Sequence, residues 1–196
     1  NDTLDVGSAA RLGAVGTNDL PAWTAVAGDG DAGNDTVWFS TTNIPEISVL
    51  PYAESFEGGA GGWVAGGANS TWQLGIPANA LIDTASDGTN AWVTNLTGQY
   101  AANELSYVES PCFDFSSIVL DPVFRFAHIF DTENCCDEGY VEITLDGGLT
   151  WNRLGTAGEG VNWYDDAVND EWDGTGSATG GTQWRLADHL LDGAAG

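Results

Sequence analysis

Hydrophobic and polar residues alternate along several short stretches of the chain, most clearly in residues 123–130. Three phenylalanines and a histidine occupy every second position from Phe124 to Phe130 and therefore share one face. Residues 140–145 alternate in the same way, and this period of two predicts β-strands. Shorter apolar runs predict further strands at residues 20–27, 36–41, 62–65, 72–75, 91–94 and 107–111.

Turn signals separate these runs. Asp-Gly pairs begin at Asp29, Asp87 and Asp146 and favour tight turns. The pattern favours a helix only in a short segment, at residues 186–191. The sequence therefore predicts an all-β protein of the sandwich type, with under about 10% helix.

Two prolines indicate a domain boundary, because proline lacks the backbone donor that a strand ladder needs. Pro45 and Pro51 enclose a predicted linker at residues 46–51. Residues 1–45 are too few for a self-sufficient sandwich, so we expect part of one domain there. Residues 52–196 are expected to form a second domain.

Acidic residues dominate the charge: 29 Asp and Glu stand against four Arg, Lys is absent, and the net charge is -25. Such a surface repels nucleic acid and anionic lipid. Nine Trp, seven Phe and five Tyr can build a core and argue against disorder. The acidity suits either simple solubility or divalent cations bound by carboxylates.

The chain lacks methionine, and no apolar run approaches the roughly 20 residues of a membrane helix. We therefore expect a fragment of an exported protein. Three cysteines occur, at Cys112, Cys135 and Cys136, without the spacing of a zinc site. Adjacent cysteines rarely bond each other without strain, so we expect Cys112 to bridge Cys135 or Cys136, which suits an oxidising compartment.

Several segments after residue 50 occur in an order that is typical of one family. They are LPYAESFE at residues 50–57, WQLGIP at 72–77, GTNAWVT at 88–94, SPCFDF at 110–115 and DGGLTW at 146–151. This series resembles the MAM-like (meprin-type) jelly-roll modules of large secreted bacterial proteins. The resemblance implies a concanavalin-like jelly-roll sandwich for residues 52–196. It says less about function, because such a module accompanies many different proteins.

Two further points concern the ends of the chain. Residues 1–45 resemble the last strands of an immunoglobulin-like domain, through residues 22–25 and 34–37. MAM-like modules usually close with another strand pair, which the sequence lacks after residue 193. We therefore expect either that the polypeptide continues or that a neighbouring subunit adds strands to open edges.

Residues 144–151 fit the Asp-box pattern Ser/Thr-x-Asp-x-Gly-x-Thr-Trp. Asp146 can accept bonds from the turn amides, Gly148 can supply a positive φ, and Trp151 can cap the hairpin. We interpret the box as a structural device. Its fixed positions are Thr144, Asp146, Gly148, Thr150 and Trp151.

Calcium is the ligand that the sequence favours most. Asp83, Asp87 and Asn90 offer oxygen donors around one turn, and hard oxygen ligands suit this ion. The resemblance implies a structural cation near Glu57. The predicted ligands are therefore Glu57, Asp83, Asp87 and Asn90, although no EF-hand spacing occurs.

The sequence argues against catalysis. Glu138 and Glu142 would face the same side of a strand roughly 13 Å apart, whereas glycoside hydrolysis needs roughly 5 to 9.5 Å. No Gly-x-Ser-x-Gly elbow accompanies the two histidines, His128 and His189. We expect a non-enzymatic protein in which His128 is packed or lines a groove.

Two surface features remain. Tryptophans beyond the needs of a core can stack on sugars, although packing is their commoner role; they are Trp63, Trp72, Trp92, Trp163, Trp172 and Trp184. An Asp-Thr-aliphatic pattern marks Thr3, Thr36 and Thr84 as O-glycosylation candidates in bacteria that export such modules.

The sequence favours an extracellular or cell-surface adhesion or structural module, stabilised by calcium and lacking catalytic activity. Its expected partners are a glycan or protein ligand on a surface, or neighbouring subunits, and not nucleic acid or the membrane interior. One alternative is a carbohydrate-binding module attached to a secreted hydrolase. Another is a filament or sheath subunit that a neighbour completes with its strands.

Overall fold

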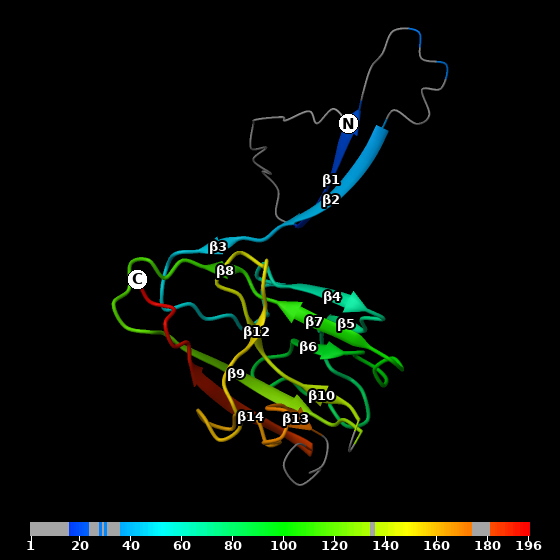
Figure 1. Cartoon of the computed structure of the whole chain (residues 1–196). Helices are drawn as coiled ribbons and strands as arrows, with labels where there is room; N and C mark the ends of the chain where they lie inside the picture. The colour runs from blue at the N-terminus through cyan, green and yellow to red at the C-terminus, as the bar shows by residue number, and fades with distance from the viewer. Residues whose placement is uncertain (1–15, 24–27, 29, 31–35, 134–135, 174–180) are drawn as a thin grey trace.

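A computed structural model describes residues 16–23, 28, 30, 36–133, 136–173 and 181–196, and every regular element in these ranges is a β-strand (Figure 1). The all-β prediction is thereby confirmed. The strands are β1 (Gly16–Trp23), β2 (Thr36–Asn43), β3 (Glu46–Ile47), β4 (Val64–Ala68), β5 (Trp72–Gly75), β6 (Ala91–Thr94), β7 (Leu105–Glu109), β8 (Cys112–Phe113), β9 (Val123–Phe130), β10 (Glu138–Gly139), β11 (Glu142–Ile143), β12 (Asn152–Arg153), β13 (Trp172–Asp173) and β14 (Gly181–Leu190).

β1 and β2 form an antiparallel hairpin that extends away from the other strands in Figure 1. The predicted linker that follows contains β3, which pairs with β8 in parallel. Pro45 also packs on Gly62, where an added Cβ would lie 2.6 Å from the Pro45 Cγ. The connection between the hairpin and the rest of the protein is therefore anchored to residues far along the chain.

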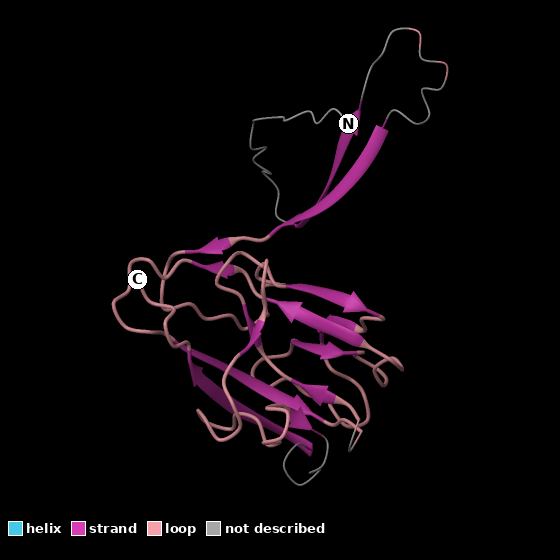
Figure 2. Cartoon of the chain, in the orientation of Figure 1, coloured by secondary structure: helices cyan, strands magenta, loops and turns pink. Residues whose placement is uncertain are grey.

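β11 pairs with β12 in an antiparallel arrangement, and the other strands lie in two groups in Figure 2. In one, β4 pairs with β7 and β5 pairs with β6, all antiparallel. In the other, β9 pairs with β14 and β10 pairs with β13, also antiparallel. This arrangement is consistent with a sandwich, while the specific jelly-roll strand order remains an expectation from the resemblance.

An aromatic cluster fills the core beside β9 and β14. Trp163, Trp172 and Ala187 are almost fully buried there, and Phe126 stands edge-on to both tryptophans at 6.1 and 5.9 Å. The two indole N–H groups are satisfied, since they donate to the carbonyls of Leu154 and Asn162. Buried tryptophans need such acceptors, so the loops that supply them are fixed by the core.

The helix predicted for residues 186–191 is wrong, because this segment is the second half of β14. Leu186–Leu190 pairs with β9 without interruption, and Ala187, opposite Phe126, is completely buried. Leu and Ala have high helix propensity, but tertiary contacts override such a preference. Here burial against the aromatic face of β9 decides in favour of a strand.

Residues 140–145 are predicted as one strand, but only Glu142–Ile143 (β11) is a strand there, and the other residues have irregular backbone. The reason is the hydroxyl of Tyr164, which accepts from the Val141 amide at 3.0 Å and donates to its carbonyl at 3.2 Å. The Val141 carbonyl also accepts from Leu154. The Tyr164 hydroxyl thus takes the Val141 amide, while the Val141 carbonyl keeps its backbone bond to the residue after β12.

His128 lies within this core, as expected for a packed histidine. Its ring centroid is 4.6 Å from that of Trp172 and within 5.8 Å of the rings of Phe126 and Phe130. Among the described residues its Nε2 has no hydrogen-bond partner. Burial, and then the charge of Arg185, lower its pKa to about 4.

We expect His128→Phe to flatten the pH dependence of stability between about pH 6.5 and 4. In this window the His128 side chain binds a proton in the unfolded chain but not in the folded protein. Lowering the pH from about 6.5 to about 4 therefore lowers the free energy of unfolding of the wild type, by up to about 3 kcal/mol. Thermal melts of both proteins at pH 7 and pH 4.5 measure the difference. Equal pH slopes in the two proteins would contradict the assignment.

Candidate functional site

The Asp-box residues form a closed hydrogen-bonded turn. Asp146 accepts from the amides of Leu149 and Thr150, at 3.0 and 2.9 Å, and from the hydroxyl of Thr150 at 2.6 Å. Thr144 donates to the same carboxylate and accepts from the amide of Gly148, at 2.8 Å each. The side chain and amide of Thr150, and then Thr144, lower the pKa of Asp146 to about 2.

Gly148 and Trp151 complete the turn. Gly148 has a φ of 88°, which a residue with a Cβ rarely adopts, and an added Cβ would lie 4.0 Å from the indole nitrogen of Trp151. Trp151 is still 42% exposed. The box therefore has the geometry expected of a structural turn.

Glu57 lies beside the turn of residues 87–90, as the predicted calcium site requires. Its carboxylate, however, accepts from the amide and hydroxyl of Thr89 and from the amide of Asn90, at 2.6 to 2.8 Å. These bonds, led by that of the Thr89 hydroxyl, lower the pKa of Glu57. Asp87 accepts from the amide of Gly88 at 3.0 Å.

The predicted calcium ligands are only partly brought together, since the contacts described join Glu57 to the turn of residues 87–90. In the part of the chain that the structure describes, no group of three or more His, Cys, Asp or Glu residues could hold a metal ion. Glu57 uses three acceptor positions to hold the turn instead, and Asp83 is exposed. A stabilising effect of calcium remains a prediction.

Glu104 holds a second pair of loops in the same way. It accepts from the amide and hydroxyl of Thr71, the hydroxyl of Ser106 and the amide of Ala101, at 2.5 to 3.0 Å. Burial raises its pKa, but these four hydrogen bonds outweigh burial, and the net pKa is lowered. Glu57, Glu104 and Asp146 thus each bind a threonine through both its amide and its hydroxyl, and we call them the carboxylate clamps.

The predicted bridge from Cys112 is wrong, because Cys112 is a free thiol. Cys136 is disulfide-bonded, and Cys135 lies outside the described residues. Cys112 lies in β8, where it pairs with Glu46 of β3, and its thiol takes no part in a disulfide. Burial, and then the charges of Glu109 and Glu46, raise the pKa of Cys112 and favour its neutral form.

The acidic loop before β10 is held in place by the hydroxyl of Tyr100. Tyr100 donates its hydroxyl to Asp137 at 2.6 Å and accepts from the amide of Glu133 at 3.4 Å. Glu138 lies on β10 opposite Asp173, and Glu142 lies on β11 opposite Arg153, so the two glutamates belong to different strand pairs. His189 contacts Glu159 at 3.3 Å, and its ring centroid is 4.8 Å from that of Trp163 in the core.

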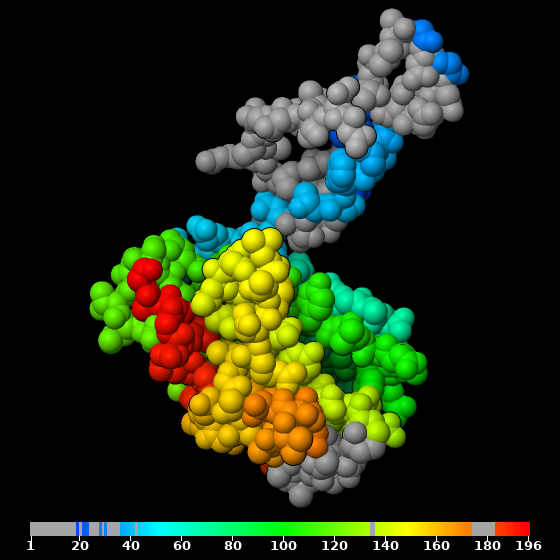
Figure 3. Space-filling model, in the orientation of Figure 1, coloured from blue at the N-terminus to red at the C-terminus, as the bar shows by residue number. Residues whose placement is uncertain are grey.

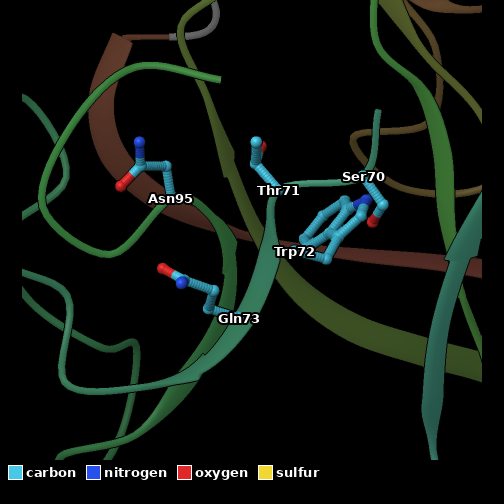
Figure 4. Close-up of a pocket in the computed structure, with 5 residues that line it drawn as sticks. All are labelled: Ser70, Thr71, Trp72, Gln73 and Asn95. Atoms are coloured by element: carbon cyan, nitrogen blue, oxygen red, sulfur yellow. The ribbon is translucent and has the colours of Figure 1, made fainter. Parts of the chain in front are cut away.

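A shallow pocket of about 270 Å³ opens beside β5 (Figure 4). Three of its polar side chains are already bonded within the protein: Thr71 to Glu104, Asn95 to the carbonyl of Gln99, and Gln73 to the amide of Leu96. Figure 4 shows Asn95 and Gln73 on one side of Thr71 and Trp72 on the other. The pocket therefore offers few polar groups to a ligand. Its lining residues are Ser70, Thr71, Trp72, Gln73 and Asn95.

The β1–β2 hairpin carries aromatic residues that the sequence reasoning missed. Trp23 and Trp38 are 69% and 65% exposed, and the register pairs Trp23 with Thr36 and Pro21 with Trp38. Directly paired residues share a face, so both indoles lie on one side as diagonal neighbours. We call this side the Trp face. The signal in the sequence was that Trp23 and Trp38 lie at alternate positions of two neighbouring predicted strands. Once these strands pair, residues 19, 21 and 23 share a face with residues 36, 38 and 40.

The glycosylation candidates are placed as follows. Thr36 is exposed on the Trp face, and Thr84 is exposed in the loop before the turn of residues 87–90, where its carbonyl accepts from the indole of Trp184. Thr3 lies outside the described residues. Both described threonines are sterically available to a modifying enzyme.

Comparisons with known proteins give one similarity. The chain is 31% identical over 136 residues to Bacillopeptidase F of Bacillus subtilis (strain 168), a match that covers 66% of this chain and 9% of that protein. The chain therefore spans about 9% of the length of this relative. No family model and no solved structure matches the chain. The described residues contain no helix of the length and apolarity needed to cross a membrane.

We expect Asp146→Asn to lower the melting temperature at pH 7, because the turn loses its bond from the Thr150 hydroxyl and its charge. The difference from wild type should shrink from about pH 4 to about pH 2, where the wild-type carboxylate is itself protonated. Hydrogen exchange of the Leu149 and Thr150 amides should accelerate. Asp87→Asn is the matched control, since among the described residues that carboxylate accepts one hydrogen bond, from the amide of Gly88, and its replacement should change stability little.

Proposed function

We propose that this chain is a non-catalytic module of a longer extracellular protein, with an adhesive or structural role. The observation that carries the proposal is the similarity to Bacillopeptidase F, which covers 9% of that protein and therefore concerns a small part of a long polypeptide. A short stretch that recurs within a long protein is what an accessory module would give. The name of the relative describes a peptidase and does not describe this stretch.

The chemistry of the described residues supports a scaffold. The carboxylate clamps use their oxygen atoms for the amides and hydroxyls of neighbouring loops. His128 is packed among aromatic rings, and its lowered pKa keeps it neutral at pH 7. An extracellular location agrees with the net charge of -25, which suits a soluble surface facing salt water.

The proposal predicts that native material from the source organism is much larger than this chain. A denaturing immunoblot with antibodies against residues 52–196 should detect a band well above 20.5 kDa in the surface or culture fraction. Deleting the coding region for these residues should reduce attachment of cells, or of the secreted protein, to surfaces. A band at 20.5 kDa inside cells, or unchanged attachment, would overturn the proposal.

We further propose that calcium stabilises the module near Glu57, because a carboxylate offers about four acceptor positions and three are occupied here. Millimolar calcium should raise the melting temperature, magnesium should do so less, and EDTA should reverse the effect. Glu57→Gln should abolish the response.

Glu104→Gln is the matched control for calcium, because Glu104 also clamps a threonine but has four acceptor positions in use. This variant should melt lower than wild type and keep its calcium response. If calcium leaves the wild-type melting curve unchanged, Glu57 acts only as a clamp.

A further inference from the structure

We propose that the Trp face of the β1–β2 hairpin binds a neutral polysaccharide by stacking its sugar rings on Trp23 and Trp38. This inference rests on the proposed adhesive function and names its ligand. The hairpin stands apart from the strands that form the core, as Figure 3 shows for the blue surface of β2 above the green, yellow and red body. The exposed fractions of Trp23 and Trp38, 69% and 65%, leave most of both indoles accessible to a ligand.

The face combines flat aromatic area with hydrogen-bonding groups. Trp23 and Trp38 are diagonal neighbours, so the indoles lie close enough to act as one surface, with Pro21 directly opposite Trp38. Asp19 and Ser40 lie further along the same face and bond each other at 2.6 Å. Rings that offer apolar faces beside hydroxyl and carboxylate groups match a sugar, which presents C–H faces and hydroxyls together.

The two faces of the hairpin differ. Ala22, Val37 and Phe39 occupy the opposite face, which offers aliphatic and phenyl surface for packing against an apolar layer. On the Trp face such a layer would bury the charge of Asp19 without a cation, which costs free energy. A hydrated sugar chain could replace the water around Asp19 and Ser40 with its own hydroxyls.

Charge selects the class of sugar. The protein carries a net charge of -25, so polyanions such as nucleic acids and acidic polysaccharides are repelled. A second copy of the chain is repelled by the same charge. The Trp face itself carries one carboxylate among its described residues, Asp19, and is therefore a weakly charged area on a strongly charged molecule.

Affinity electrophoresis in native gels tests the proposal with four neutral polysaccharides: mixed-linkage β-glucan, xylan, mannan and dextran, with alginate as the anionic control. At least one neutral polymer should retard the wild-type chain, and alginate should not. Trp23→Ala and Trp38→Ala should each weaken the interaction at least about tenfold. Val37→Thr, on the opposite face of the same strand, should bind as wild type does.

Trp38→Phe guards against loss of the hairpin, since it keeps an aromatic ring and should retain part of the affinity. The proposal is overturned if no neutral polymer retards the protein, or if both alanine variants bind normally. It is also overturned if light scattering shows a wild-type dimer that Trp38→Ala dissociates. If the alanine variants lose sugar binding but the deletion described above leaves attachment unchanged, only the adhesive role fails. If attachment needs the module but not the tryptophans, only the sugar site fails.

Discussion

The scarcity of cations constrains this structure more than any other property. Four arginines cannot neutralise 29 carboxylates, so most acidic side chains need a different partner or water. The carboxylate clamps supply one solution: Glu57, Glu104 and Asp146 bind the amide and hydroxyl of a threonine across a loop. Charge-assisted hydrogen bonds are stronger than neutral ones, and they act where the strands are short and the connections long. Acidity, usually a matter of solubility, here contributes to loop structure.

One of the described arginines compensates a buried carboxylate. Arg153 bonds Glu171, which is only 4% exposed, and also donates to the carbonyls of Asn169 and Asp170 while covering the ring of Tyr140. Removing this guanidinium would leave a buried charge uncompensated, which is more damaging than losing an exposed ion pair. The pair of Arg125 with Asp188 is of the exposed kind and contributes little.

Local pattern predicted what depends on local chemistry. The strands β5, β6 and β9 have the predicted bounds, because strict alternation fixes both the element and its buried face. The Asp box was also predicted, since all its partners lie within eight residues. Contacts between distant residues were not predictable. Tyr164 bonds the backbone of Val141, pairing with β9 makes residues 186–190 a strand, and Cys112 is a free thiol in β8 beside β3. Each of these features depends on which distant segment packs beside the residue, and local secondary-structure propensity carries no information about that.

Polar groups that hold the fold and side chains that are open to a ligand lie in different parts of the molecule. In the body, the polar groups with the right chemistry for a ligand are largely occupied: the pocket beside β5 has three bonded side chains, and Glu57 retains about one acceptor position. A ligand there would have to break hydrogen bonds that hold loops. Its binding free energy would then be only the difference between the bonds formed and the bonds lost. On the hairpin, Trp23 and Trp38 are mostly exposed and have no ring contact among the described residues. A ligand at that face would break no ring contact of these indoles with the described residues, which is the physical reason for placing the proposed sugar site on the hairpin.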